Sequence, residues 1–406
     1  MQAGKLKILY KIHEFNGGAP RSLLAFARVL QSLGHDVMAI GERGPIQSAW
    51  EEAGIPVIES PMARRRRPFD SWKELTKLKK TIYRFDPDLI HAATIDEGFF
   101  IRFLMPQTPI LQTIAGGKGP TNRSLIWRDL PVVGFSDECL EALKRNIPQF
   151  RGNIFFIKER LDVKEILEKS KKELPRQLPL GPIILHTSRL EGNKLVGVKQ
   201  TIEAYFRLLE KGTNASMVVL GGGPDEQLVH DFVNREKEKY PNATVIFLGM
   251  VENPYPFYLA ADIVTGVGRC VWEGMALAKP AIVVGELGSA GIVNETTAPE
   301  MIEYNFSGRN LKAKVPPGKL EKEISKLIED EQYYRKCSDF SKDFIFREYD
   351  AWSNATKIEA MYRRCISNSQ IPPYQRKIFF EGLKIFCHAA LKKLLNCPGV
   401  AGDSIS

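Results

Sequence analysis

Short apolar runs alternate with amphipathic stretches between residues 183 and 286. The apolar runs cover residues 183–187, 215–220 and 243–248, and each is followed by a glycine or a polar residue. Apolar residues at helical spacing lie between the first two runs, within residues 199–210. This alternation predicts a parallel sheet with helices on both faces. Ligands of such sheets bind outside the carboxyl ends of the strands, so the residues that follow each run are the first candidates for a site.

The N-terminal part of the chain has the same organisation. An apolar run at residues 7–10 is followed by Gly17 and Gly18, by a helical pattern over residues 21–33 and by a second run at residues 37–40. Glycines let the backbone approach a ligand closely, and free N–H groups at a helix start attract anions. The loop is therefore either a ligand contact or a tight turn alone. It is not a dinucleotide fingerprint, because it lacks G-x-G-x-x-G.

Length and charge limit the class of protein. A chain of 406 residues favours two domains, and a formal net charge of +9 favours anionic partners. Nucleotide phosphates, acidic lipid headgroups and nucleic acid are all anionic, but no motif for reading RNA or DNA is present, so nucleic acid is the weakest candidate. The six cysteines form no CxxC pair and no zinc spacing, which indicates reduced thiols in a cytosolic protein. Without a secretion signal or a spanning apolar stretch, we expect a cytoplasmic protein that is soluble or bound to a membrane surface.

Six features between residues 188 and 280 occur in one order and carry a resemblance. The chain resembles the nucleotide-binding half of a GT-B glycosyltransferase, in particular the retaining family-4 type. The features are Ser188-Arg189-Leu190, Lys194, Gly221-Gly222-Gly223-Pro224, Leu248-Gly249, Ala261-Asp262 and Glu273-Gly274-Met275-Ala276-Leu277-Ala278-Lys279-Pro280.

The resemblance implies an α/β fold with two Rossmann-like, doubly wound domains that face a central cleft. The segment before the second domain is rich in Lys, Glu and Pro, which fits a linker. The expected parts are an N-terminal acceptor-side domain (1–165), a linker (166–181), a C-terminal nucleotide-sugar-binding domain (182–340), a helix crossing back to the first domain (341–366) and a basic amphipathic extension (367–406).

Arg189 and Lys194 are the expected catalytic residues. A departing diphosphate gains negative charge, and cations placed at a strand end and a helix start would stabilise it. Arginine offers a forked contact and lysine a point charge. No Asp-x-Asp metal motif is apparent between residues 188 and 280, so we expect neither a metal nor a cofactor.

Glu273 corresponds to the second glutamate of the family's Glu-x7-Glu box, which accepts hydrogen bonds from the ribose hydroxyls. The first glutamate of that box contacts the sugar in the family, and its position here is Thr265. Arg269 either compensates with a phosphate or sugar contact or is an exposed structural arginine. The glycine-rich turns after the second and third runs would shape a base pocket whose backbone reads uracil. The other expected substrate contacts in this half are Ser188, Gly222, Gly223 and Val251.

The first half offers fewer matches to the family. His91 stands alone at a strand end and is either a packed histidine or a ligand contact. Many relatives carry a histidine facing the reacting sugar where this chain has Ala115. The expected substrate contacts in this half are Gly17, Gly18, His91, Gly116 and Gly117.

Two basic segments bear on the partners. Four arginines at residues 64–67 form either a solvated loop or a contact with anionic lipid or a charged acceptor. Residues 376–395 place aromatic and aliphatic side chains opposite lysines. Such a basic amphipathic helix either lies on an anionic membrane surface or packs against the domain or a second copy.

We therefore predict a metal-independent, retaining glycosyltransferase. It would move a sugar from a nucleotide-sugar donor, a UDP-sugar by resemblance, to a glycan or lipid-linked acceptor in cell-surface polysaccharide or glycoconjugate synthesis. Its location would be cytoplasmic and peripheral on the inner face of the membrane. One alternative is a non-catalytic nucleotide-sugar-binding or scaffold protein, which Thr265 and Ala115 favour. Another is a GT-B sugar-nucleotide epimerase, which would need a richer set of acid and base residues.

Overall fold

The chain folds into two compact units. The computed structural model describes residues 4–60, 68–115, 117–122, 124–174, 178–179 and 181–369. Unit 1 comprises residues 1–157 and 355–406, and unit 2 comprises residues 158–354. The chain therefore leaves unit 1, forms the whole of unit 2 and returns.

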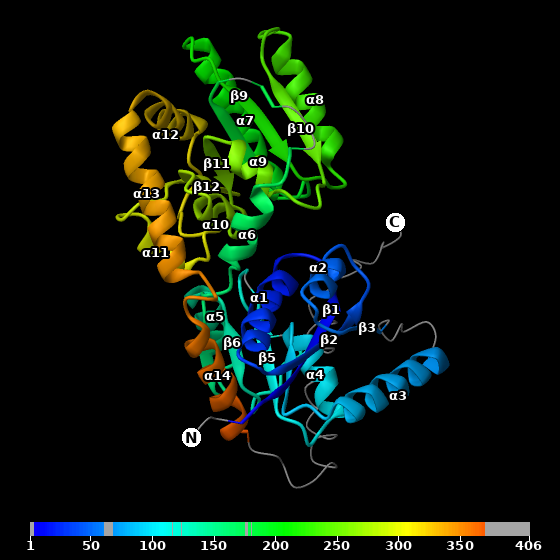
Figure 1. Cartoon of the computed structure of the whole chain (residues 1–406). Helices are drawn as coiled ribbons and strands as arrows, with labels where there is room; N and C mark the ends of the chain where they lie inside the picture. The colour runs from blue at the N-terminus through cyan, green and yellow to red at the C-terminus, as the bar shows by residue number, and fades with distance from the viewer. Residues whose placement is uncertain are drawn as a thin grey trace, which may run out of the picture. The chain divides into compact units, whose positions relative to one another are not determined.

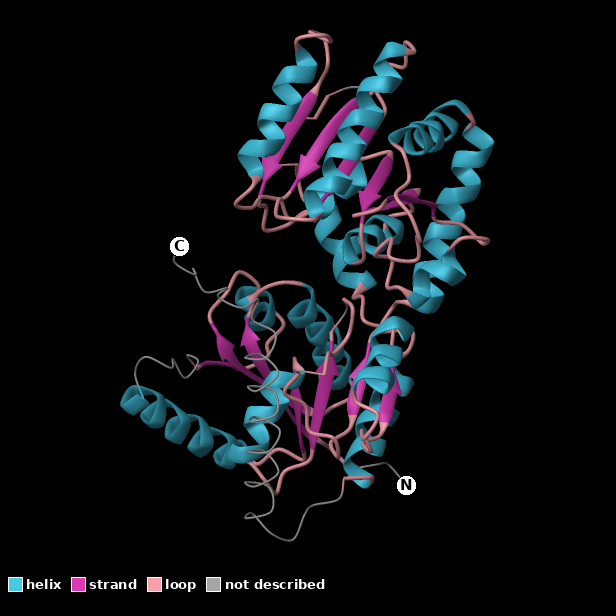
Figure 2. Ribbon diagram, turned by 180° about the vertical axis from the view of Figure 1, so that it is seen from behind, coloured by secondary structure: helices cyan, strands magenta, loops and turns pink. Residues whose placement is uncertain are grey.

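Unit 1 contains a seven-stranded sheet in the order β3-β2-β1-β4-β5-β6-β7. All its neighbouring strands are parallel. The order reverses between β1 and β4, and Figure 2 shows the parallel strands side by side. The strands are β1 (Lys7–Glu14), β2 (Asp36–Glu42), β3 (Val57–Glu59), β4 (Leu89–Ala92), β5 (Ile110–Ile114), β6 (Val132–Gly134) and β7 (Ile154–Phe156).

The helices of unit 1 lie between successive strands, except for the last one. Thr94 and Ser136 cap the starts of two helices, because each hydroxyl accepts a hydrogen bond from a backbone N–H three residues later. The helices, labelled in Figure 1, are α1 (Gly18–Ser32), α2 (Gln47–Glu52), α3 (Pro68–Phe85), α4 (Ile95–Leu104), α5 (Asp137–Asn146) and α14 (Ala355–Ser367).

Unit 2 contains a six-stranded sheet in the order β10-β9-β8-β11-β12-β13, in which only β13 runs antiparallel to its neighbour. Successive residues of β8 enter different cores: Ile183 and Leu185 pack on one face, and Ile184 packs on the other. Burial on both faces explains the continuous apolar runs. The strands are β8 (Ile183–Thr187), β9 (Ser216–Leu220), β10 (Val245–Gly249), β11 (Ile263–Gly266), β12 (Ala281–Gly285) and β13 (Gly288–Ile292).

Helices cover both faces of this second sheet, as the two separate cores require. The two doubly wound sheets confirm the predicted fold class. The helices are α6 (Val163–Ser170), α7 (Lys194–Glu210), α8 (Glu226–Lys237), α9 (Tyr255–Ala260), α10 (Arg269–Ala276), α11 (Ala298–Glu303), α12 (Pro317–Glu329) and α13 (Glu331–Glu348).

The boundaries between the two units differ from the domain boundaries that the sequence analysis expects. Residues 158–165 were assigned to the first domain and residues 166–181 to a linker, yet α6 packs into the core of unit 2. The Leu161 N–H donates to the Tyr349 carbonyl at 2.9 Å, and the Leu161 carbonyl accepts from the Ala351 N–H at 2.9 Å. These bonds hold the entering and leaving segments of unit 2 side by side. Of the segment 341–366, only the part from residue 355 onward belongs to unit 1.

A buried polar chain attaches α14 to the sheet of unit 1. The Tyr362 hydroxyl lies 2.6 Å from His91 Nδ1 and 2.9 Å from the Tyr10 hydroxyl, and His91 Nε2 lies 2.8 Å from Thr113 Oγ1. Burial lowers the pKa of His91 to about 3, so the ring is neutral and exchanges hydrogen bonds with two hydroxyl groups. His91 therefore connects β4 to α14.

Two further expectations can be compared with the described residues. Cys139, Cys270, Cys337 and Cys365 are free thiols, and burial raises the pKa of Cys270 and of Cys365 to about 12. Across the described part of the chain, no helix combines the length and apolar character needed to cross a membrane. The arginine run at 64–67 and the basic segment at 376–395 lie outside the described residues.

Tyr362→Phe should destabilise unit 1 by about 1–3 kcal/mol, because it leaves His91 Nδ1 and the Tyr10 hydroxyl buried without this partner. Urea unfolding followed by circular dichroism measures the change. Tyr83→Phe is the matched control, since the Tyr83 side chain is 57% exposed and should change stability by less than about 0.5 kcal/mol. Equal unfolding midpoints for the two variants would contradict the anchoring role.

Candidate functional site

The loop after β8 is held by the glycine-rich loop after β9. The Ser188 N–H donates to the Leu220 carbonyl at 3.1 Å, and the Leu190 N–H donates to the Gly222 carbonyl at 3.0 Å. A Cβ atom on Gly221 would lie 1.9 Å from the Ser188 carbonyl oxygen, and one on Gly223 would lie 2.3 Å from that of Leu190. These glycines are therefore required for close backbone packing. The sequence analysis expected the glycine-rich turn only to shape a base pocket.

Arg189 and Lys194 share one carboxylate partner in this loop. Arg189 Nη1 lies 3.1 Å and Lys194 Nζ 3.0 Å from the same Glu191 oxygen. The hydrogen bond from Lys194, together with the charges of both cations, lowers the pKa of Glu191. The Arg189 side chain is 68% exposed. The two cations predicted from the sequence are thus brought together on an accessible loop.

Lys194 is also the first residue of α7, which has no side-chain cap. A cation at a helix N-terminus opposes the helix dipole by roughly 0.3–1 kcal/mol, whereas an anion there is favourable. The start of α7 therefore combines backbone N–H groups, a lysine and a nearby arginine. Such a combination is suited to a phosphate group.

Glu273 and Arg269 form an ion pair on α10. Arg269 Nε lies 2.8 Å from Glu273 Oε1, and the Glu273 side chain is only 8% exposed. Burial acts to lower the pKa of Arg269, but the charge of Glu273 and further anionic neighbours more than offset it, so that pKa is raised. The sequence analysis expected Glu273 to bind the ribose and left Arg269 as either a ligand contact or an exposed structural arginine. In the structure the two side chains neutralise each other, and Glu273 also contributes to the packing of unit 2.

Thr265 is fully buried, with 0% of its surface exposed. Its hydroxyl lies 2.9 Å from His186 Nδ1, and that nitrogen also lies 3.0 Å from Thr201 Oγ1. Burial lowers the pKa of His186 to about 3, so the network is neutral. A sugar cannot touch Thr265 in this structure, and the hydroxyl instead connects β11 to β8 and α7.

The remaining candidates in unit 2 lie on neighbouring loops. Gly221 forms a bridge with Gly249, and its N–H donates to the Gly249 carbonyl at 2.9 Å. The turn that contains Val251 therefore lies beside the loop of Gly222 and Gly223. Val251 is partly buried against the core of unit 2. A base contact by these residues stays a prediction.

The candidates of unit 1 divide into exposed and buried residues. Gly17 and Gly18 are exposed at the start of α1, where Gly17 has a φ of 83°. Gly117 also has a positive φ, of 98°, and Gly116 lies outside the described residues. His91 is 0% exposed and has hydrogen bonds on both ring nitrogens, so it is the packed histidine of the two alternatives.

Sequence reasoning missed a charged cluster at the carboxyl end of β1. Glu97, at the start of α4, lies 2.7 Å from Lys11 Nζ and 3.0 Å from His13 Nδ1. The pattern Thr94-x-x-Glu97 is a capping-box signal for a helix start, but it does not indicate these partners. The cluster stands where the strand order of unit 1 reverses, which is the usual ligand position in such a sheet.

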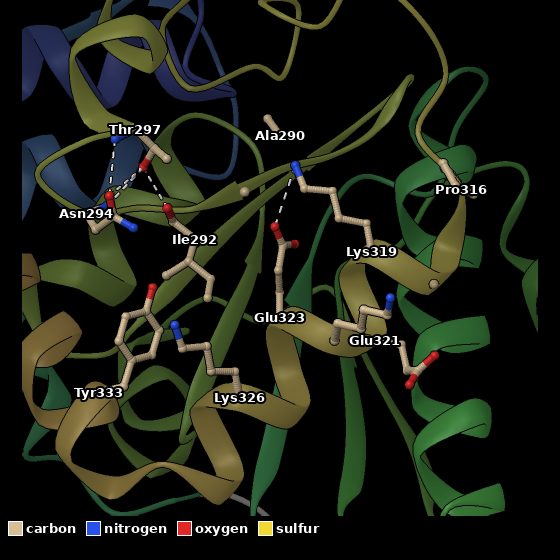
Figure 3. Close-up of a pocket in the computed structure, with 13 residues that line it drawn as sticks. Ala290, Ile292, Asn294, Thr297, Pro316, Lys319, Glu321, Glu323, Lys326 and Tyr333 are labelled. Atoms are coloured by element: carbon tan, nitrogen blue, oxygen red, sulfur yellow. Dashed lines mark hydrogen bonds and ion pairs between the residues drawn. The ribbon is translucent and has the colours of Figure 1, made fainter.

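A separate cavity of about 800 Å³ lies elsewhere in unit 2, beside β13 and α12. Figure 3 shows Lys319 beside Glu323 and Lys326 beside Tyr333, and Lys326 Nζ lies 3.7 Å from the centroid of the Tyr333 ring. None of the residues predicted from the sequence lines this cavity. Within the described ranges, no group of three or more His, Cys, Asp or Glu side chains could hold a metal ion.

Two family models match the chain. Residues 16–116 match the family described as Glycosyltransferase Family 4, and residues 168–344 match the one described as Glycosyl transferases group 1. The chain belongs to the GT-B glycosyltransferases. The comparison with curated proteins gives no match.

Solved structures share the fold of this glycosyltransferase at low identity. Anabaena Alr3699/HepE in complex with UDP and glucose is 17% identical, covers 90% of this chain and 100% of its own, and has a TM-score of 0.65. A glycosyltransferase from Rickettsia africae is 18% identical with the same coverage and a TM-score of 0.64. UDP-GlcNAc 2-epimerase from Neisseria meningitidis, bound to UDP-GlcNAc, is 15% identical, covers 88% of this chain and 100% of its own, and has a TM-score of 0.57.

Gly223→Ala should destabilise unit 2 of the glycosyltransferase by about 1–3 kcal/mol, the usual range for overpacking, because the new Cβ meets backbone. Gly222→Ala is the matched control, since its Cβ would meet the Glu226 carboxylate at 3.2 Å and Met250 Cγ at 3.3 Å, which are side-chain and not backbone atoms. Thermal unfolding of both variants measures the difference. A Gly223→Ala variant as stable as Gly222→Ala would show that the loop after β8 is not held as described.

Proposed function

We propose that this chain transfers a sugar from a UDP-sugar to a glycan or lipid-linked acceptor, with retention at the anomeric carbon and without a metal ion. Membership of the glycosyltransferase family supports group transfer. Retention rests on the resemblance to the family-4 type alone. The proposed setting is the synthesis of cell-surface polysaccharide or glycoconjugate, in the cytoplasm and at the inner face of the membrane.

The loop after β8 is the observation that carries the proposal. The side chains of Arg189 and Lys194 contact the same Glu191 oxygen, beside the start of α7. This position follows the carboxyl end of β8, and ligands of such sheets bind at the carboxyl ends of strands. A diphosphate there would receive a forked contact from Arg189, a point charge from Lys194 and N–H groups from the helix. These groups can offset the charge that develops on the leaving diphosphate.

The choice of uridine rests on the ligands bound in solved structures that share this fold. The Anabaena protein was crystallised with UDP and glucose, and the Neisseria epimerase with UDP-GlcNAc. Both share the fold with this chain. We assign the base to the region of Gly222, Gly223 and Val251 and the sugar-phosphate end to Ser188, and Gly17 and Gly18 stay predicted substrate contacts of unit 1.

Glu273 is proposed to accept hydrogen bonds from the ribose hydroxyls. Arg269 already occupies one of its oxygens, Oε1, at 2.8 Å. A carboxylate has two oxygens and about four lone-pair sites, so a diol can bind while the ion pair persists. Arg269 then acts as the group that orients Glu273.

A non-catalytic nucleotide-sugar-binding or scaffold protein is the second candidate. Two observations favour it: Ala115 carries no ionisable group, and Thr265 is buried against His186. The positions where relatives contact the sugar therefore offer no charged side chain here. Turnover of a nucleotide sugar separates this candidate from the first.

Arg189→Ala should weaken UDP affinity about 10–100-fold, since a charge-assisted hydrogen bond contributes roughly 1.5–3 kcal/mol, and should lower donor hydrolysis by orders of magnitude. Calorimetry with UDP and release of free UDP from UDP-sugars, in the presence of a chelator, measure both effects. Arg335→Ala is the matched control, because Arg335 is an exposed arginine paired with Glu331 and should change neither value.

Three results would contradict parts of the proposal. Stabilisation by ADP or GDP but not by UDP, measured as a melting-temperature shift, would exclude the uridine assignment. Hydrolysis that stops with chelator and returns with Mg²⁺ or Mn²⁺ would exclude the metal-free mechanism. Tight UDP binding without turnover of any nucleotide sugar would favour the non-catalytic candidate.

Binding to an anionic membrane is proposed for the basic segment 376–395, which carries the sequence signature of an interfacial helix. Deleting residues 371–406 should abolish sedimentation with phosphatidylglycerol vesicles and leave UDP affinity unchanged. Exchanging Lys377, Lys384 and Lys392 for glutamate tests the charge without shortening the chain. A deleted protein that no longer folds would instead support a helix packed on the domain.

A further inference from the structure

The cavity beside β13 and α12 has the size of a ligand site. Its volume of about 800 Å³ lies within the range of roughly 300–1,000 Å³ that is typical of small-molecule pockets. Ala290 and Ile292 of β13 line one side, α12 lines another, and Tyr333 near the start of α13 contributes an aromatic ring. All of these residues belong to unit 2, so the cavity is complete within one unit.

Three lysines of α12 line the cavity: Lys319, Lys322 and Lys326. Residues three and four apart lie on one face of a helix, so the three ammonium groups are presented to the same side. Lys326 Nζ lies 3.7 Å from the centroid of the Tyr333 ring, and Figure 3 shows the two side chains next to each other. The face of an aromatic ring attracts a cation, which holds the Lys326 ammonium at the cavity.

The carboxylates that line the cavity already have partners. Glu323 lies 3.6 Å from Lys319 Nζ and accepts a hydrogen bond from the Ser289 hydroxyl, and burial raises the pKa of Glu323. Glu321 pairs with Lys211, which does not line this cavity. Lys319 is therefore balanced by Glu323, and neither carboxylate balances a second lysine.

Two further carboxylates, Glu329 and Asp330, line a smaller cavity that shares Lys322 and Lys326 with the first. Glu329 accepts from the Ser325 hydroxyl at 2.5 Å, and Asp330 accepts from the Tyr333 N–H at 2.8 Å as the cap of α13. Within the described part of the chain, Lys322 and Lys326 form no ion pair with any carboxylate. Two ammonium groups at the cavity are thus left without a balancing charge.

We propose that this cavity is a ligand site, separate from the loop after β8, and that it binds a small molecule carrying a phosphate monoester. Such a phosphate has a charge of about −1.5 to −2 at pH 7, which matches the two unbalanced lysines. A single carboxylate would balance only one of them. Lysine binds phosphate as a point charge, without the fork that arginine offers to a carboxylate. The ring of Tyr333 and the side chain of Ile292 are available to contact the organic part of the ligand.

The cavity and the proposed diphosphate site lie toward opposite ends of the parallel strands of unit 2. Ile292 pairs with Ile282, near the amino end of β12, because β13 runs antiparallel to β12. Arg189 instead follows the carboxyl end of β8, and β8, β11 and β12 are parallel. The two sites therefore use different residues, and the cavity proposal does not depend on the proposed sugar transfer.

Three sugars of graded charge test the ligand class: glucose 6-phosphate, glucuronate and glucose. Calorimetry with the full chain should show binding of glucose 6-phosphate, at least about tenfold weaker binding of glucuronate, and none of glucose, because the affinity follows the charge that is neutralised. Inorganic phosphate should bind more weakly than glucose 6-phosphate, since it lacks an organic part. Added NaCl should weaken the binding of both phosphates, because it screens partly exposed charges.

Lys322→Gln and Lys326→Gln should each weaken the affinity for glucose 6-phosphate about 10–100-fold, the usual effect of losing one charge-assisted hydrogen bond. Lys342→Gln is the matched control: Lys342 is an exposed lysine of α13 that does not line the cavity, and its removal should leave the affinity unchanged. Arg189→Ala should also keep the wild-type affinity for glucose 6-phosphate, whatever its effect on UDP. Equal melting temperatures would show that the lysine variants remain folded.

Three results would overturn the proposal. If neither inorganic phosphate nor glucose 6-phosphate binds at millimolar concentration, the cavity is not a phosphate site. If Lys342→Gln weakens binding as much as Lys322→Gln and Lys326→Gln do, the phosphate responds only to the net charge of the protein. If Arg189→Ala abolishes binding of glucose 6-phosphate, the phosphate occupies the loop after β8, and the proposed diphosphate site would then stand without the second site.

Discussion

Backbone contact between the loops after β8 and β9 is the constraint on which the site of unit 2 depends. Any side chain on Gly221 or Gly223 would overlap the Ser188 or Leu190 carbonyl group, so the two loops pack backbone to backbone. That contact fixes the chain on either side of Arg189. The exposed Arg189 guanidinium is therefore attached to a rigidly held backbone. Less conformational entropy would be lost when this side chain binds an anion.

The sequence predicted the sheets because strands buried on both faces read as continuous apolar runs. It also located Arg189 and Lys194, whose position depends on a local strand–loop–helix unit. It did not predict the burial of Thr265 or decide between the two alternatives for His91, since their partners His186 and Tyr362 lie 79 and 271 residues away. The Glu97–His13 contact was missed for the same reason, with 84 residues between the partners. The Arg269–Glu273 pair, at i and i+4 on a helix, could have been read from the sequence.

Three histidines show how environment decides the role of one residue type. His91 and His186 are buried among hydroxyl groups, and burial lowers the pKa of each to about 3, so they stay neutral and connect elements. His13 is half exposed and lies 3.0 Å from the Glu97 carboxylate. The buried pair contributes to the fold because it cannot take up a proton readily. The ring of His13 is accessible to solvent and belongs to no such buried network.

Glu191 explains how two cations can remain together in the proposed diphosphate site. Like charges on Arg189 and Lys194 would repel, and the shared carboxylate removes that repulsion. An exposed ion pair contributes only about 0–1 kcal/mol, so exchanging Glu191 for an incoming anion costs little. A diphosphate carries more charge and more acceptor oxygens than one carboxylate, and it can also accept from the N–H groups at the start of α7. In the proposed site, Glu191 would therefore occupy the position of the phosphate between the two cations, and it would return to them when the nucleotide departs.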